Sequence, residues 1–202
     1  MTDSYQKALF LPLIQRFGYD PRGLGWKSKQ SQYQRFKVLS QGLTNVSSIL
    51  DVGCGFGDFY DYVRAQGFEG SYLGIDGLST VIDMAQKAYP SGHFLQSSLE
   101  EFTSTTSYDW VVACGVFNVA CPSQMVYFRS QIAHLCRLSA HEIRLNVLID
   151  DGVSQKANGL YYYDPQEVFS ICSLYAPTEV MACQNQDYAL KMTFPLFKTL
   201  NK

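Results

Sequence analysis

The stretch Ile49-Leu50-Asp51-Val52-Gly53-Cys54-Gly55-Phe56-Gly57-Asp58-Phe59 decides the fold of this chain. Its first four residues are mostly apolar, which is typical of a buried strand, and a run with helical spacing begins near Asp58. Between them, a glycine at every second position lets the backbone turn tightly and approach a ligand with no Cβ atom in the way. The stretch therefore predicts a strand, a turn that faces a ligand, and a helix.

The sequence on both sides repeats this alternation. Short β-like runs are expected at residues 48–52, 71–75, 93–96, 109–114 and 142–149. Apolar residues recur at three- and four-residue steps in the stretches 57–66, 79–88 and 123–139, which predicts helices there. Because right-handed crossovers return each strand to the same sheet, repeated βαβ units require a parallel sheet with helices on both faces. The expected fold class is therefore doubly wound α/β.

Local signals mark the ends of several elements. Ser79 and Ser123 are expected N-caps, and Asp164-Pro165-Gln166-Glu167 is typical of a capping box that opens a helix reaching to about Leu174. Two strand-like runs follow, at residues 179–184 and 188–194, joined by a turn signal at residues 185–187. We therefore expect an antiparallel pair at the end of the sheet.

The first 45 or so residues are the least regular part of the sequence. Residues 18–25 predict a mobile loop, and a helix is expected near residues 30–40. We expect residues 1–44 to form an N-terminal helical arm or lid, and residues 45–202 to form the ligand-binding domain.

Composition and charge exclude several classes of protein. A length of 202 residues, with 47% hydrophobic and 17% charged residues, fits one folded domain and excludes a disordered chain. The formal net charge of −2 disfavours nucleic acid and an anionic membrane as partners. The apolar run at residues 8–14 is too short for a membrane span and lacks the basic cluster of a signal peptide.

The cysteines and histidines indicate a reducing compartment and no metal. The six cysteines are widely spaced with no C-x-x-C pair, which favours the cytoplasm. Because none of the three histidines has metal-type spacing with these cysteines, no metal site is expected.

The spacing of the glycines separates two kinds of ligand. A dinucleotide-binding turn has G-x-G-x-x-G, but Asp58 occupies the third glycine position here, and its negative charge would face phosphate oxygens. Asp51 lies near the end of the first strand, and Asp76 ends the next one, where a carboxylate accepts both hydroxyls of a ribose. One acid for an ammonium group and one for a ribose fit a nucleoside with an amino-acid tail, which describes S-adenosylmethionine.

These residues resemble the motifs of the class I S-adenosylmethionine-dependent methyltransferases. Residues 51–57 are similar to the first motif of the family, and residues 74–79 are similar to its ribose-binding second motif. The resemblance covers roughly residues 45–196 and implies a Rossmann-like methyltransferase fold with a seven-stranded mixed sheet that ends in a reversed strand. It also implies a set of cofactor-binding residues: Asp51, Gly53, Cys54, Gly55 and Gly57 at the methionine part, Asp76 at the ribose, Gly77 and Leu78 at the adenine, and Cys114 after the fourth strand.

The sequence departs from the family pattern in two places. Many members carry an Asp after the third strand that binds the adenine amino group, whereas Ser98 stands there in this chain, so adenine selection is left to Ser98 or to backbone groups of Leu99. After the fourth strand, residues 114–118 lack the Asn/Asp-Pro-Pro-Tyr turn of enzymes that methylate DNA bases. Methylation of that type is therefore not expected. Residues 25–36 and 161–169 are similar to segments of a small, soluble bacterial subgroup, which brings no substrate with it.

Outside these motifs, several side chains are candidates for the site. Arg35 is placed to reach the methionine carboxylate or to lie solvated at the surface. Trp26 is a candidate lid over the cofactor or a residue that docks the N-terminal arm. Phe117, Asn118 and Tyr162 are candidates for the acceptor side, where Asn118 would orient the nucleophile and Tyr162 would line an aromatic pocket. Each of the three is equally consistent with a turn or core role.

The expected function is therefore methyl transfer from S-adenosylmethionine to a small-molecule acceptor by in-line displacement. Two alternatives stay open: a regulatory or scaffold protein that binds S-adenosylmethionine without catalysis, and an NAD-dependent oxidoreductase. The sequence does not determine the acceptor, a general base or the oligomeric state.

Overall fold

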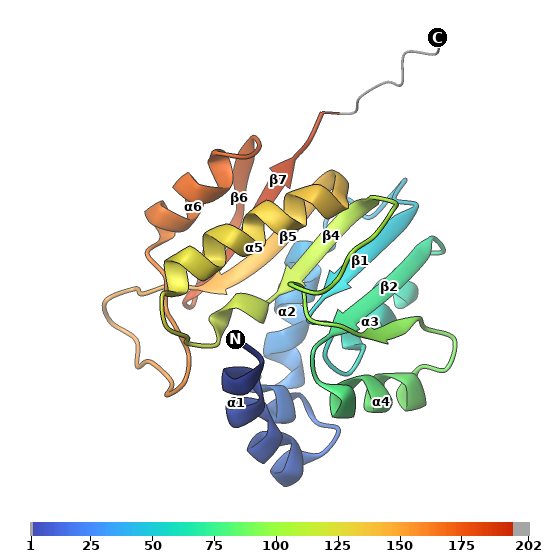
Figure 1. Cartoon of the computed structure of the whole chain (residues 1–202), viewed down its shortest axis with the longest axis horizontal. Helices are drawn as coiled ribbons and strands as arrows, with labels where there is room; N and C mark the ends of the chain where they lie inside the picture. The colour runs from blue at the N-terminus through green and yellow to red at the C-terminus, as the bar shows by residue number, and fades with distance from the viewer. Residues whose placement is uncertain (1, 196–202) are drawn as a thin grey trace.

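The computed structural model describes residues 2–195 of the chain. Its centre is a seven-stranded sheet with the order β3-β2-β1-β4-β5-β7-β6 (Figure 1). The strands are β1 (Ser48–Val52), β2 (Ser71–Asp76), β3 (Phe94–Gln96), β4 (Tyr108–Cys114), β5 (Ser139–Leu148), β6 (Thr178–Gln184) and β7 (Asp187–Thr193). The strand order reverses between β1 and β4, which places the crevice of an open α/β sheet at their carboxyl ends.

Strand directions confirm the expected mixed sheet. The first five strands are parallel, while β7 runs antiparallel to both β5 and β6. The β6–β7 hairpin turns at Asn185 and Gln186, whose φ angles of 51° and 64° are those of a two-residue turn that follows the strand twist. The predicted C-terminal antiparallel pair is therefore confirmed.

Helices cover both faces of the sheet. On one face α5 (Gln124–Leu138) and α6 (Pro165–Ser173) pack over a core that includes Leu50 and Val52, and on the other α2 (Lys29–Leu39), α3 (Asp58–Ala65) and α4 (Ser79–Ala88) pack over a core that includes Ile49. The alternation of side chains along β1 divides its residues between these two cores. The doubly wound α/β class is confirmed.

The N-terminal segment is more regular than the sequence indicated. A helix, α1 (Thr2–Phe17), occupies the region expected to be irregular, and a short 3-10 helix, η1 (Pro21–Leu24), lies within the expected mobile loop. The Asp20 carboxylate caps η1 by accepting the Arg22 backbone N–H at 2.9 Å. Local capping and packing of Leu24 beside buried Phe56 therefore give this loop a defined shape.

The helix α2 is part of the protein core. Its Phe36 and Leu39 are buried in the same cluster as Ile49 and Phe59. By contrast, α1 packs beside Phe56 and Leu78 above the carboxyl ends of the strands, through Phe10 and Ile14. Of the expected arm at residues 1–44, only α1 and η1 thus lie over the edge of the sheet where a site is expected.

The expected helix caps differ in outcome. Asp164 caps α6 by accepting the backbone N–H groups of Gln166 and Glu167 at 2.7 and 3.0 Å, which confirms the N-cap but not the reciprocal bond of a capping box. The prediction for Ser79 was wrong, because α4 begins at Ser79 itself and Leu78 is the N-cap. Ser123 holds the N-cap position of α5, but its side chain makes no capping hydrogen bond.

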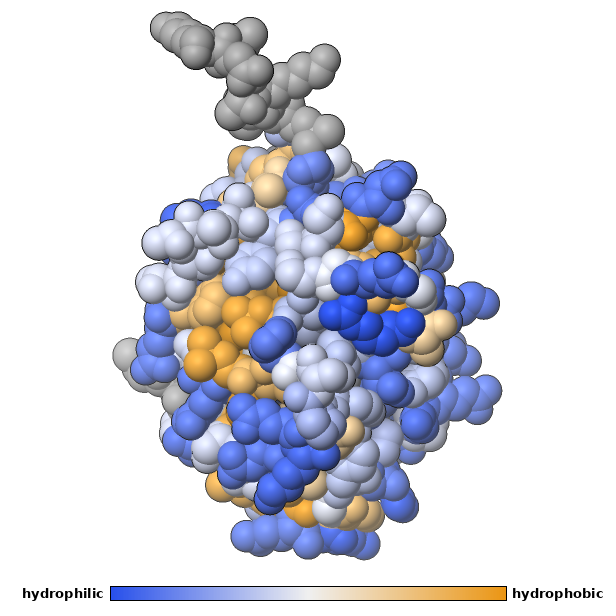
Figure 2. All heavy atoms as spheres, turned by 90° about the vertical axis from the view of Figure 1, so that its right-hand side faces the viewer, coloured by the Kyte–Doolittle hydropathy of each residue, from blue (hydrophilic) through white to orange (hydrophobic). Residues whose placement is uncertain are grey.

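The face of the molecule that Figure 2 shows is mostly polar. Figure 2 shows hydrophilic side chains over most of one face, with apolar side chains gathered in a few patches between them.

Among residues 2–195, no helix is long and apolar enough to cross a membrane. The same residues contain no cluster of three or more His, Cys, Asp or Glu side chains arranged to hold a metal ion.

Candidate functional site

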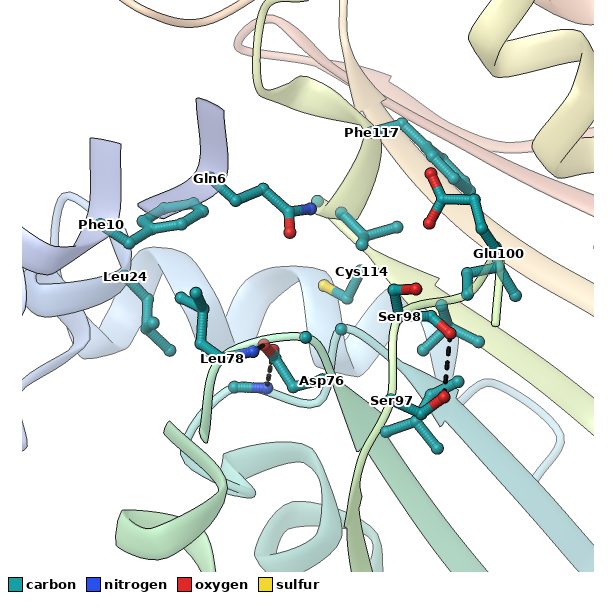
Figure 3. Close-up of a pocket in the computed structure, with 18 of the residues that line it drawn as sticks. Gln6, Phe10, Leu24, Asp76, Leu78, Ser97, Ser98, Glu100, Cys114 and Phe117 are labelled. Atoms are coloured by element: carbon teal, nitrogen blue, oxygen red, sulfur yellow. Dashed lines mark hydrogen bonds between the residues drawn. The ribbon is translucent and has the colours of Figure 1, made fainter. Parts of the chain in front are cut away.

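A cavity opens at the carboxyl ends of β1 to β4, where the chain order of the sheet reverses. Loops after each of these strands form its floor and walls, and α1 and η1 contribute its roof (Figure 3). The space between its walls is about 810 Å³, which includes the part that is open to solvent. We call it the first cavity. Ten of the residues that the sequence predicted for the site line it: Gly53, Gly55, Asp76, Gly77, Leu78, Ser98, Leu99, Cys114, Phe117 and Trp26.

Asp76 is fixed on the floor of this cavity. Its Oδ2 accepts the backbone N–H of Gly55 at 3.2 Å, and its Oδ1 accepts the N–H of Leu78 at 3.0 Å (Figure 3). The carboxylate therefore ties the glycine turn to the loop after β2.

The glycine turn approaches other parts of the chain closely. Gly53 and Gly55 have φ angles of 69° and 57°, which a residue with a side chain rarely adopts. A Cβ atom on Gly53 would lie 2.7 Å from the Val116 side chain, and one on Gly55 would lie 2.6 Å from Leu24. Glycine is thus required by both the turn and the packing above it.

Asp51 lies beneath the glycine turn and is not among the residues that line the first cavity, in contrast to Asp76. Its side chain is 1% exposed and accepts a hydrogen bond from the Tyr72 hydroxyl on β2. Burial raises the pKa of this carboxyl to about 7, against the opposing effect of the Tyr72 hydrogen bond, and the charge of Asp76 adds to the rise. Of the two acids, Asp76 lines the first cavity and Asp51 does not, so a ligand contact of Asp51 stays a prediction.

Three other predicted cofactor residues also lie outside the first cavity. Cys54 is buried and faces Gly74 on β2, and Gly57 packs against the rings of Phe94 and Tyr89. Arg35 forms an ion pair with Asp187 at 2.5 Å, with both side chains largely buried, so it is neither solvated nor placed at the first cavity. The first cavity therefore has a smaller set of polar lining groups than the sequence indicated.

Several lining residues were missed in the sequence. Figure 3 shows Gln6 and Phe10 reaching from α1, with Leu24 beside them, while Glu100 lies across the cavity near Phe117. No local pattern marks Gln6 or Phe10, because their position depends on how α1 folds back over the sheet. Glu100 lies two residues beyond Ser98, which is the only sequence signal for it. Ser98 itself donates to Glu101 at 2.9 Å.

A second cavity shares a wall with the first. Phe10, Leu24, Trp26 and Gly115 line both cavities, and these four residues form the shared wall. The second cavity extends between α1 and the segments after β4 and β5. The predicted acceptor-side residues Asn118 and Tyr162, together with Arg35, line this second cavity, whereas Phe117 lines the first.

Asn118 is held with its amide at the shared wall. Its Oδ1 accepts the Leu148 backbone N–H at 2.8 Å, and its Nδ2 lies 3.5 Å from the point where a Gly115 Cβ would stand. Tyr162 accepts the Ala157 backbone N–H at 2.9 Å through its hydroxyl. Both side chains thus stabilise loops and line the second cavity at once.

The charges of the first cavity fit a positively charged nucleoside. Its charged lining side chains are the carboxylates of Asp76 and Glu100, and no Lys, Arg or His stands among the described residues that line it. Apolar walls from Leu78, Leu99 and Phe117 suit the flat face of a base. A ribose, a base and a cationic sulfur therefore match the groups present.

Sequence comparison places the chain among known proteins. Residues 49–138 match the family model of a methyltransferase domain. A relative in Mycobacterium tuberculosis, Rv1506c, bears a methyltransferase name and is 32% identical over 130 residues, which are 62% of this chain and 78% of the relative.

Solved structures share the fold. The protein PH0226 of Pyrococcus horikoshii OT3 is similar with a TM-score of 0.72 at 14% identity, over 91% of this chain and 99% of that one. Magnesium protoporphyrin IX methyltransferase of Synechocystis PCC 6803, crystallised with S-adenosylhomocysteine, is similar with a TM-score of 0.63 at 16% identity, over 95% and 96% of the two chains.

The sheet order and the acid-lined cavity at its reversal define a Rossmann-like protein that binds a nucleoside. Together with the sequence match, they give the family: the chain belongs to the class I S-adenosylmethionine-dependent methyltransferases. The NAD-dependent alternative finds no support in these comparisons.

Proposed function

We propose that this methyltransferase acts on a small-molecule acceptor, with S-adenosylmethionine in the first cavity and the acceptor in the second. The observation that carries the proposal is the wall of Phe10, Leu24, Trp26 and Gly115 that the two cavities share. Methyl transfer requires the acceptor atom about 3 Å from the methyl group, so the acceptor space must adjoin the donor space.

Each lining group has a proposed role toward the cofactor. The Asp76 carboxylate accepts the ribose hydroxyls, and the turn at Gly53 and Gly55 lets the backbone lie against the amino-acid part. Leu78 and Leu99 enclose the adenine, with Ser98 beside it. Asp51 acts indirectly in this proposal, by supporting the strand that carries the turn.

The cofactor supplies a methyl group on a positively charged sulfur. A lone pair of the acceptor forms the new bond to the methyl carbon, and the electron pair of the broken carbon–sulfur bond stays on the sulfur. The protein contributes alignment and exclusion of water, which together supply roughly 7–11 kcal/mol in well-oriented reactions. We propose that α1, η1 and the segment after η1 act as the lid that excludes water, through Phe10, Leu24 and Trp26 respectively. The Asn118 amide N–H groups would orient the acceptor at the shared wall.

Two observations support a small acceptor. The net charge of −2 gives no field that favours a nucleic-acid backbone. The structural relative from Synechocystis is named for magnesium protoporphyrin IX, which is a small molecule.

The proposal is tested in two stages. Titration calorimetry with S-adenosylhomocysteine is expected to give saturable binding, which Asp76→Ala weakens. A screen for transfer of labelled methyl groups to pools of small molecules, peptides and RNA is expected to label the small-molecule pool. Cofactor binding with no transfer to any pool would favour the scaffold function instead.

A further inference from the structure

The two adjacent cavities carry opposite charge. The first is lined by the carboxylates of Asp76 and Glu100, whereas the charged side chains that line the second are Arg22, Lys27 and Arg35. Among residues 2–195, no Asp or Glu lines the second cavity. The change of sign occurs across the wall that contains Trp26 and Gly115.

Two of these three cations already have carboxylate partners. Arg22 pairs with Asp20 at 2.7 Å, and Arg35 pairs with Asp187 at 2.5 Å. Lys27 has no ion pair within 4.0 Å in the described part of the chain, and its side chain is exposed; its charge also acts on Asp187 from a longer distance and lowers the pKa of that carboxyl. The ammonium of Lys27 is therefore the charge that a ligand in this cavity can pair with.

The rest of the second cavity is largely apolar. On one side Leu9, Leu13 and Phe17 of α1 line it, and on the other Val119, Leu148 and Leu160 do so. An apolar body between these walls loses contact with water, which is favourable at about 25 cal/mol per Å² buried. A ligand that uses the whole cavity thus needs an apolar body and one anionic group.

We propose that the methyl acceptor is an amphipathic anion, with its apolar body between α1 and the segments after β4 and β5, and its anionic group at Lys27. The inference rests on the proposed use of the second cavity as the acceptor site. The reacting atom then lies at the shared wall, beside Gly115 and Asn118, and the anionic group at Lys27 is a different group from the atom that is methylated.

The same arrangement would reject other ligands. A cationic acceptor would meet the Lys27 ammonium with no anionic group to offer it, and a ligand without an apolar body would gain little from the apolar walls. Opposite charge on the two sides of the wall also keeps the cationic donor and the anionic acceptor each in its own cavity.

The experiment uses the full chain saturated with S-adenosylhomocysteine and three probes of one shape: 1-naphthoate, its uncharged amide 1-naphthamide, and 1-naphthylmethylammonium. NMR titration at low ionic strength gives each dissociation constant. We expect 1-naphthoate to bind about fivefold more tightly than 1-naphthamide, as fits one partly exposed ion pair. Added salt should reduce this preference.

Variants at position 27 test which group carries the preference. Lys27→Met should make the two probes bind equally, and Lys27→Glu should make the ammonium probe the tightest of the three. Lys29→Met is the matched control, because Lys29 is also exposed but does not line the second cavity, and it should leave the preference unchanged.

Three results would overturn the inference: equal binding of acid and amide to the wild type, an unchanged preference in Lys27→Met, or no binding of any probe. Failure of the proposed function is seen separately, as absence of S-adenosylhomocysteine binding or of methyl transfer. A protein that binds S-adenosylhomocysteine and shows no charge preference would lose this inference alone.

Discussion

The guanidinium carbon of Arg35 lies 4.9 Å from the centre of the Trp26 ring. The same guanidinium donates to Asp187 at the start of β7, and through Nη1 to the Ser31 backbone carbonyl at 2.9 Å. One side chain thus connects α2, the hairpin and the indole that separates the two cavities.

Arg35→Met should destabilise the protein by about 3 kcal/mol, because Asp187 would remain largely buried without its cation. Burial already raises the pKa of Asp187, against the lowering effect of Arg35. Urea unfolding measures the loss, with Arg129→Met on the exposed face of α5 as the control that should change stability by less than about 0.5 kcal/mol. Equal stability of the two variants would show that the ion pair contributes nothing.

Asp76→Ala should weaken S-adenosylhomocysteine binding at least about fivefold, since a hydrogen bond to a charged acceptor contributes roughly 1.5–3 kcal/mol. Titration calorimetry at constant pH checks this, and Asp83→Ala, an exposed acid on α4, should bind like the wild type. Unchanged affinity in Asp76→Ala would remove this carboxylate from the site.

Asp51→Asn should change how stability depends on pH. Because the folded state holds the Asp51 proton up to about pH 7 and the unfolded state releases it near pH 4, the wild type loses stability as pH rises between these values. The Asn variant has no such proton, so its stability relative to wild type should rise over this window by about 2–4 kcal/mol.

Urea unfolding of both proteins at pH 5, 6, 7 and 8 measures this difference. All other titrating groups are shared, so their contributions cancel between the two proteins. Parallel profiles would show that Asp51 ionises in the folded protein at its ordinary pKa.

Gly55→Ala should destabilise the protein by about 1–3 kcal/mol, because the new methyl group meets Leu24 and the backbone is in the left-handed region. Adding Leu24→Ala removes the clash with the new methyl group but leaves the cost of the left-handed backbone conformation. The double-mutant cycle should therefore show a coupling above about 0.5 kcal/mol. Strict additivity in chemical unfolding would show that η1 does not rest on the glycine turn in solution.

The sheet was predictable because its signals are local. Apolar runs, helical spacing and the Asp164 cap each depend on neighbours within a few residues. The predicted class, the reversed last strand and the position of the cavity beside the glycine turn all follow from them.

The errors concern side chains whose partners are distant in sequence. Asp51 points to the same face of β1 as Ile49, because side chains alternate along a strand. Its hydrogen-bond partner Tyr72 lies on β2 and comes near only because β1 and β2 pair in the sheet. Arg35 pairs with a residue 152 positions away. Gln6 and Phe10 reach the cavity only because α1 folds back over the sheet, and no local pattern encodes that.

The most direct test of the central claim is a crystal structure of the chain with S-adenosylhomocysteine. We expect the ribose hydroxyls within about 3.2 Å of the Asp76 carboxylate and the sulfur facing the wall at Trp26 and Gly115, toward the second cavity. A ligand bound elsewhere, or a sulfur directed away from that wall, would contradict the account.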